Sequence, residues 1–163
     1  MNKLEIKLAV ESDKALLYKW LEEPGVLHWF PMQDPREVED SVECWMSFIK
    51  QGAVWTAYYD GEPCGIANLY LHATKKLCHQ ALFAIIVAEK FRNKGIGTML
   101  LNEVMKKAKD QFGIEILHLE VYEGNPAISL YQRLGFEEFG FHRKVLKEQD
   151  GTYLGKHMMQ KKL

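Results

Sequence analysis

The sequence is poor in cysteine and has no long apolar run, and both shortages exclude whole classes of protein. Three cysteines occur in 163 residues, and none stands in a C-x-x-C pair. A disulfide-stapled miniprotein is therefore excluded, and reduced thiols are expected. The longest wholly apolar run, residues 81–88, is far shorter than the roughly 20 residues of a membrane-spanning helix. Residues 1–7 lack the apolar core of a signal peptide, so we expect a cytoplasmic protein without a membrane partner.

The chain also lacks an excess of charge of either sign. It has 21 Lys and Arg against 22 Asp and Glu, a formal net charge of −1. A nucleic-acid-binding domain usually carries a basic surface, so no nucleic-acid partner is predicted. The charge is nevertheless uneven, with nine acidic and three basic residues in 11–43 and two acidic and six basic residues in 142–163. One explanation is that these residues form solvated faces of helices and strands. The alternative is functional, with an acidic side that binds an acceptor substrate and a basic side that binds a cofactor.

The apolar pattern that is present predicts one α/β domain over residues 1–163. Alternating, β-branched and aromatic residues predict strands over 4–8, 53–59, 65–71, 79–87, 115–122, 139–146 and 152–160. Apolar residues at helical spacing predict about four helices, near residues 12–22, 35–49, 97–108 and 126–134. Ser12 is expected to cap the first helix, and Pro24-Gly25 to end it. The order of these elements predicts a mixed sheet of about seven strands with helices on both faces.

The most informative segment is 85–98, where an apolar strand passes through a short basic loop into a helix. Such a turn presents unpaired backbone N–H groups and the positive end of the helix dipole, which together bind phosphate. Gly95 and Gly97 let the backbone approach an anion closely, and Arg92 and Lys94 add positive charge. A Walker loop is excluded because Lys94 precedes Gly95, and a dinucleotide fingerprint because position 100 is Leu. Alone, the segment is equally compatible with a structural turn.

Further motifs follow this loop in the order Leu119-Glu120-Val121, Asn125 and Leu130-Tyr131-Gln132-Arg133-Leu134-Gly135-Phe136. Together with Arg92-x-x-Gly95-x-Gly97 they resemble the GNAT superfamily of N-acetyltransferases. The resemblance covers most of the chain and is strongest from residue 85 to 136. It implies a GNAT-like fold with a splayed central sheet, acetyl-CoA as co-substrate and no metal. The implied reaction is direct attack of a neutral amine on the thioester, with no covalent enzyme intermediate.

The same resemblance assigns contacts to acetyl-CoA. Backbone groups of Ile85, Ile86 and Val87 would bind the pantetheine arm, and Asn125 matches an asparagine on the pantetheine side. The pyrophosphate would be wrapped by Arg92, Asn93, Lys94, Gly95, Ile96, Gly97 and Thr98. The stretch from Asn125 to Tyr131 is one residue shorter than the usual family spacing. That departure motivates an alternative function, a non-catalytic acyl-CoA-binding module.

The resemblance also assigns the proton transfers. Tyr131 matches the tyrosine that protonates the leaving CoA thiolate, although its helical spacing is equally typical of core packing. Glu120 lies five residues before Asn125, as does the general-base glutamate of ribosomal-protein alanine N-acetyltransferases, and we expect it to be partly buried. His79 is a second candidate base, because it opens the central strand where other relatives carry a carboxylate. A water chain without a side-chain base is a third reading.

The acceptor is the least specified part of the sequence. The resemblance places Glu23, Trp29 and Phe30 at the acceptor cleft, where aromatic walls and carboxylates suit a cationic amine such as an aminoglycoside or a polyamine. A protein N-terminal amine or a lysine amine is the alternative. A thiol enzyme is a further hypothesis that depends only on the three cysteines. By analogy with the family, the exposed edge of the final hairpin could pair in a homodimer.

Overall fold

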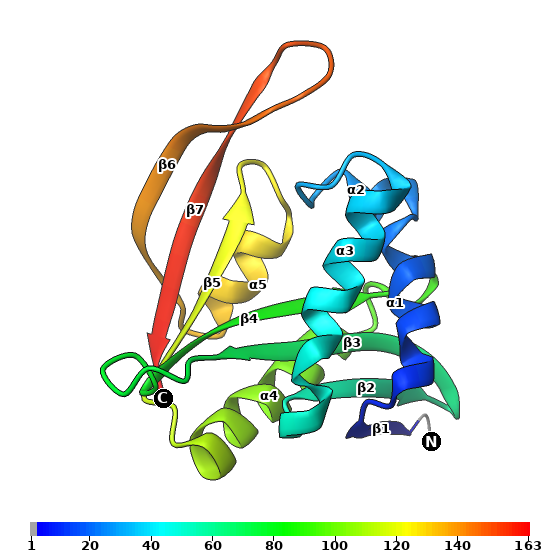
Figure 1. The fold of residues 1–163 in the computed structure, drawn as a ribbon, viewed down its shortest axis with the longest axis vertical. Helices are drawn as coiled ribbons and strands as arrows, with labels where there is room; N and C mark the ends of the chain where they lie inside the picture. Colours follow the sequence, from blue (N-terminus) through cyan, green and yellow to red (C-terminus); the bar gives the residue numbers. More distant parts are fainter. Residues whose placement is uncertain (1–2) are drawn as a thin grey trace.

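The centre of the molecule is one seven-stranded sheet (Figure 1), in a computed structural model that describes residues 3–163. The strands are β1 (Leu4–Leu8), β2 (Val54–Tyr59), β3 (Glu62–Leu71), β4 (Gln80–Val87), β5 (Ile116–Tyr122), β6 (Glu137–Lys147) and β7 (Tyr153–Lys162). Their order across the sheet is β1-β2-β3-β4-β5-β7-β6. All neighbours are antiparallel except β4 and β5, which are parallel. The predicted mixed sheet of about seven strands is confirmed.

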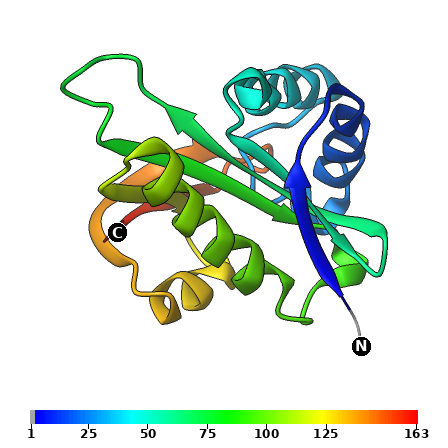
Figure 2. The same ribbon diagram turned by 90° about the horizontal axis from the view of Figure 1, so that it is seen from below.

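Helices cover both faces of this sheet (Figure 2). Within residues 3–163 they are α1 (Lys14–Leu21), α2 (Pro24–Leu27), α3 (Pro35–Met46), α4 (Ile96–Phe112) and α5 (Ala127–Arg133). Three 3-10 turns join them to the strands, η1 (Glu11–Asp13), η2 (Ser47–Gln51) and η3 (Glu89–Phe91). The α1–α3 helices lie on one face, and α4 lies on the other (Figure 2). None of the helices in this part of the chain is long and apolar enough to cross a membrane.

The short helix α2 adds one helix to the predicted set of about four. Pro24-Gly25 was expected only to end the first helix, but α1 already ends at Leu21 and Pro24 begins the one-turn helix α2. Proline suits this place because the first helical residue needs no N–H for an intrahelical bond. The start of the third helix is confirmed. The Asp34 side chain accepts the Glu37 N–H at 3.0 Å, and together the two residues form a capping box.

The expected cap at Ser12 is wrong, and the neighbouring Asp13 takes a different role. Its Oδ2 accepts the Val10 N–H at 3.1 Å and the Thr56 hydroxyl at 2.7 Å. Because Asp13 and Thr56 are both buried, these bonds satisfy polar groups that are otherwise costly to remove from water. They attach the start of α1 to β2.

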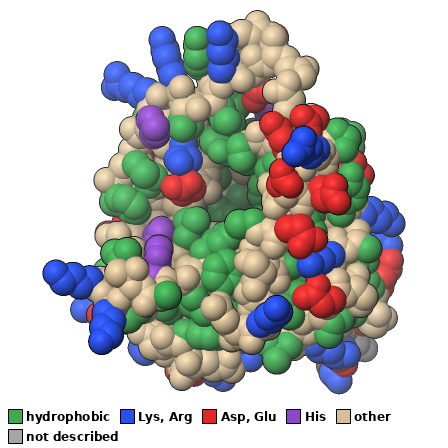
Figure 3. Space-filling view, in the orientation of Figure 1, with side chains coloured by type: hydrophobic (Ala, Val, Ile, Leu, Met, Phe, Trp, Pro, Cys, Tyr) green, Lys and Arg blue, Asp and Glu red, His purple; other side chains and the backbone are tan. Residues whose placement is uncertain are grey.

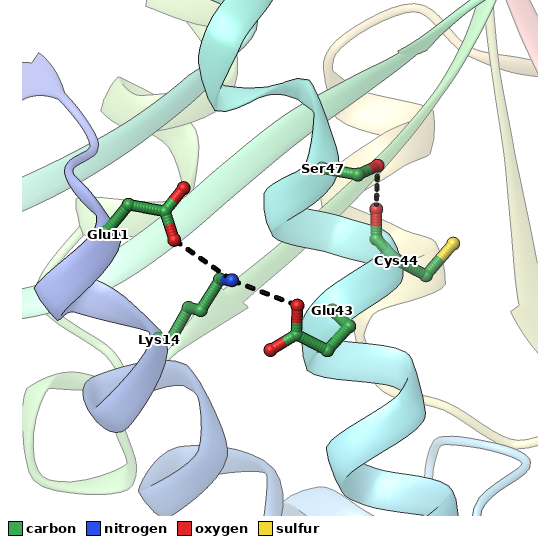
Figure 4. Close-up of polar contacts among 5 residues, drawn as sticks. All are labelled: Glu11, Lys14, Glu43, Cys44 and Ser47. Carbon is green, nitrogen blue, oxygen red and sulfur yellow. Dashed lines mark hydrogen bonds and ion pairs between the residues drawn. The ribbon is translucent and has the colours of Figure 1, made fainter.

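A charged bridge holds α1 against α3 on the surface (Figure 4). The Lys14 ammonium contacts Glu11 and Glu43, each at 2.9 Å. Hydrogen bonds to the two carboxylates raise the pKa of Lys14, that to Glu43 most. The α1–α3 helices are thereby held as one unit over the N-terminal half of the sheet.

The central strands separate halfway along their length, and this separation creates the functional cavity. β4 and β5 pair at only three positions, Gln80 with Ile116, Ala81 with Leu117 and Leu82 with His118. β5 instead pairs along its whole length with β7. β4 continues to Val87 and β5 to Tyr122, so the two strands diverge beyond this short ladder (Figure 1). The splayed sheet implied by the resemblance is confirmed.

Candidate active site

The divergence of β4 and β5 opens a cavity of about 530 Å³. Its lining comes from the diverging halves of both strands (83–87 and 119–121), the loop into α4, helix α5, and the segment after α2. Figure 3 shows the molecule hollowed between the side of α1–α3, where acidic side chains gather, and the side of β5–β7. The nearly continuous apolar residues of 79–87 predict a strand buried on both faces, but Ile85 and Val87 are only half-buried because they face this space.

The basic loop forms one end of the cavity. Asn93 and Gly95 adopt left-handed conformations, with φ of 60° and 75°, and turn the chain into the start of α4. The cavity is lined here by Arg92, Asn93, Gly95, Ile96, Gly97 and Thr98. The first-turn N–H groups of α4 have no intrahelical acceptors and the helix dipole is positive there, so this end suits a phosphate group. A Cβ at Gly97 would lie 3.5 Å from the Leu130 side chain, in ordinary contact, and because Gly97 lines the cavity a large side chain there would occupy it.

Lys94 differs from the rest of the loop. Its ammonium lies 5.3 Å and 5.5 Å from the ring centroids of Phe91 and Tyr59, and it is not among the residues that line the cavity. Its positive charge still lies one residue from Gly95.

Tyr131, on α5, lines the cavity that opens between the diverging strands β4 and β5. Its side chain is 8% exposed, and its ring packs edge-on against Phe83 and Phe136, with centroids 6.1 Å and 6.2 Å away. Burial raises the pKa of the phenol to about 12. The tyrosine is therefore both a core residue and a cavity residue that keeps its proton at neutral pH. Asn125 lines the cavity nearby, and its side chain accepts the Ala127 N–H at 2.9 Å at the start of α5.

Glu120 also lines the cavity, but it is less buried than predicted. Its side chain is 45% exposed, and Oε2 lies 2.9 Å from the Lys156 ammonium. On the same face of β5, burial and the nearby His72 lower the pKa of His118, so that imidazole is neutral at pH 7. The Glu120 carboxylate therefore lines the cavity while it is paired with the Lys156 ammonium. The alternation of residues 115–122 does not predict this pairing.

Three predicted groups lie elsewhere. His79 immediately precedes β4, at the closed end of the β4–β5 ladder, and is not in the cavity lining. Glu23 accepts the Glu89 N–H at 3.1 Å, which ties the α1–α2 turn to η3, and it also lies outside the lining. No cysteine lines the cavity. Burial raises the pKa of the Cys64 thiol to about 11, which makes it a poor nucleophile.

The aromatic residues after α2 form the opposite wall. Trp29 and Phe30 both line the cavity, and their role in binding the acceptor stays a prediction. The outer ring of Trp29 lies 3.9 Å from where a Cβ would stand on Gly124, so it reaches the loop after β5. Phe30 also lines a second groove of about 550 Å³ between residues 24–33 and the β6–β7 turn. The shared residue connects the groove with the first cavity.

Sequence reasoning missed two groups on α5 and one on β7. Ser129 and Arg133 line the cavity, and their spacing of four residues on a helix could have indicated this shared face. Lys156 could not have been found in this way, because its pairing with Glu120 depends on strands that are far apart in the sequence. No cluster of His, Cys, Asp and Glu able to hold a metal occurs within residues 3–163.

Comparisons with known proteins agree with this geometry. The family model described as "Acetyltransferase (GNAT) family" matches residues 15–136. An N-alpha-acetyltransferase of Sulfurisphaera tokodaii is 42% identical over 72 residues, covering 44% of this chain and 43% of that protein. The matched regions span about half the length of such curated relatives.

Solved structures share the fold over nearly the whole chain. A ribosomal-protein-alanine N-acetyltransferase from Brucella melitensis has a TM-score of 0.81 at 24% identity, covering 98% of this chain and 99% of that one. The structure of yncA from Salmonella typhimurium, determined with its cofactor acetyl-CoA, has a TM-score of 0.82 at 21% identity, covering 98% and 94%.

Proposed function

This chain belongs to the GNAT family of acetyltransferases, and we propose that it transfers the acetyl group of acetyl-CoA to a primary amine, with a peptide N-terminal amine as the acceptor. The observation that carries the proposal is the cavity itself. It runs from the anion-binding start of α4, past the buried Tyr131, to the Glu120 carboxylate. The names of the archaeal relatives support an N-terminal acceptor.

Acetyl-CoA supplies the activated acetyl group, and the residues present suit its binding. Its pyrophosphate matches the first-turn amides of α4 and the Arg92 guanidinium. Its pantetheine arm matches the edge of β4 at Ile85–Val87, because the ladder to β5 ends at Leu82 and leaves that edge facing the cavity. Asn125 and Arg133 provide further polar groups along the same wall.

Tyr131 is the group we assign to the leaving sulfur. As the amine nitrogen bonds to the thioester carbon and the carbon–sulfur bond breaks, the sulfur gains negative charge. A phenol whose pKa is raised to about 12 by burial keeps its proton at neutral pH and can donate it toward that sulfur. The products are the acetylated amine and the CoA thiol.

We assign the proton lost by the amine to Glu120, directly or through water, because it is the one carboxylate that lines the cavity among the described residues. His79 lies outside the cavity lining, and its role as a base stays a prediction. The acceptor would enter past Trp29 and Phe30, with the chain after its amine in the second groove.

The setting of the reaction is part of the same proposal. Cys44, Cys64 and Cys78 are all free thiols, which suits a reducing, cytoplasmic compartment. The homodimer through the free edge of β6 also stays a prediction.

Two measurements test the proposal. Calorimetric titration with acetyl-CoA and CoA should give micromolar dissociation constants for the wild-type protein. In Gly97→Trp these constants should rise at least about 100-fold, because the indole fills the cavity. Met99→Trp is the matched control, since Met99 is exposed on the same turn of α4. Wild-type protein should then release CoA with a peptide acceptor. Binding without release across a panel of peptides and amines would instead support the acyl-CoA-binding module, and absence of binding would refute both functions.

A further inference from the structure

The ion pair between Glu120 and Lys156 joins β5 to β7 beside the cavity, which Glu120 lines. Lys156 is on β7, its ammonium lies 2.9 Å from Glu120 Oε2, and its side chain is only 17% exposed. The neighbouring Gly155 is fastened to the end of β5 twice, through its N–H to the Glu123 carboxylate and through its carbonyl to the Glu123 N–H, both at 2.9 Å. The backbone that carries Lys156 is therefore fixed beside the strand that carries Glu120.

The two residues that stand opposite Lys156 in the ladders do not add a second negative charge beside the pair. Tyr122 on β5 and His142 on β6 stand opposite Lys156 in the two ladders. Burial raises the pKa of Tyr122, so its phenol is uncharged at neutral pH. His118, two residues before Glu120, is neutral for the reason given above. The Glu123 carboxylate keeps its negative charge, but it lies an odd number of residues from Glu120 and accepts the N–H of Gly155, which faces away from Lys156 in the strand alternation.

An amine acceptor must approach this pair in one of two states. A protonated amine would place a second ammonium beside one carboxylate that Lys156 already neutralises, leaving a net positive charge at the cavity wall. A neutral amine adds no charge, and it is also the form that attacks a thioester. The pair therefore opposes binding of the unreactive, protonated form.

We propose that Lys156 is a positioning residue that restricts the enzyme to acceptors whose amine arrives uncharged, and so favours α-amino groups over strongly basic amines such as lysine side chains. The chemistry of the acceptors gives the discrimination. At about pH 7.5 roughly one third of peptide α-amines are neutral, against about one in 800 lysine amines. The inference rests on the proposed function and replaces the cationic acceptor expected from the sequence.

The test uses two peptides of the same length. One has a free N-terminus and no lysine, and the other has an acetylated N-terminus and one lysine. For the wild-type protein with acetyl-CoA, kcat/KM for the α-amine should exceed that for the lysine amine by at least about 100-fold. In Lys156→Met the unpaired carboxylate can bind an ammonium, and the ratio should fall at least tenfold, mainly through a lower KM for the lysine peptide.

Two further variants separate this role from a merely structural one. Lys156→Arg keeps the positive charge and should retain the wild-type ratio. Lys162→Met removes an exposed lysine from the same face of β7, about six residues away, and should change nothing. Thermal unfolding of each variant reports whether it is folded. A ratio unchanged in folded Lys156→Met, or wild-type activity that is equal on both peptides, would overturn the inference.

A binding measurement keeps the inference testable without turnover. In the presence of CoA, the lysine peptide should bind Lys156→Met about tenfold more tightly than wild type by calorimetry. Absence of acetyl transfer to every amine, with this binding difference present, would refute the proposed function alone. Equal binding by the two proteins would refute the role of Lys156.

Discussion

Replacing Tyr131 with phenylalanine removes one oxygen from the cavity wall and leaves the ring in place. The ring is held by Phe83 and Phe136, and the side chain is 8% exposed, so Tyr131→Phe should fold normally. What it loses is the donor for the leaving sulfur. A hydrogen bond to a charged group contributes about 1.5–3 kcal/mol, which corresponds to a loss of roughly 10- to 150-fold in kcat. KM for acetyl-CoA should change little, because the charge develops only in the transition state.

The assay should measure CoA by chromatography. Cys44 and Cys78 are exposed free thiols and would react with a chromogenic thiol reagent. Tyr153→Phe is the matched control, since Tyr153 is exposed at the start of β7 and outside the cavity. A Tyr131→Phe enzyme with kcat within twofold of wild type at saturating substrates would refute the assignment of Tyr131 as the acid.

Tyr131→Phe should also change how the free energy of unfolding depends on pH above pH 10. Burial raises the pKa of Tyr131 to about 12 in the folded protein, above the value of about 10 in the unfolded chain. The folded form therefore holds its proton where the unfolded form has lost it. The resulting stabilisation is complete below pH 10 and is lost between about pH 10 and 12, by up to about 2.7 kcal/mol. Urea titrations should show this loss in wild type and a smaller one in Tyr131→Phe.

Two predictions concern the scaffold of the site. In Gly65→Ala the new Cβ would lie 2.8 Å from the Ile86 carbonyl oxygen. The free energy of unfolding in urea should therefore fall by about 1–3 kcal/mol, and acetyl-CoA should bind more weakly. An unchanged urea midpoint would contradict the close approach of β3 and β4. Asp34→Ala removes the cap of α3 and should cost about 1 kcal/mol, whereas Asp40→Ala on the same helix, exposed and away from the cap, should cost less than half of that.

Much of the fold and part of the site could be predicted from short stretches of sequence. The capping box at Asp34 needs residues only three positions apart, and the turn from β4 into α4 needs the glycines and basic residues of 92–98. Alternating, β-branched and aromatic residues predicted all seven strands, because these residue types suit a pleated strand wherever it lies in the sheet. These features depend on neighbours in the chain, and the structure confirms them as elements.

The failures of prediction have a common physical cause. Pro24 was interpreted as a helix end, although proline is equally suited to begin the next helix, and only the packing of α2 over the cavity decides between the two. His79 and Ile85 belong to the same predicted strand. Which of them reaches the cavity depends on where β5 leaves β4, and that point is not encoded in the strand's own alternation.

The sequence by itself determined the secondary structure, the glycine-containing basic loop into α4 and the family, because these depend on local propensity and on motifs a few residues long. The tertiary structure alone decided where the central strands separate and which charge stands beside Glu120. Lys156 is 36 positions from Glu120, and it arrives there because β7 inserts between β5 and β6 in antiparallel register. Such pairing depends on the free energy of the whole sheet, so no single segment of the chain specifies it.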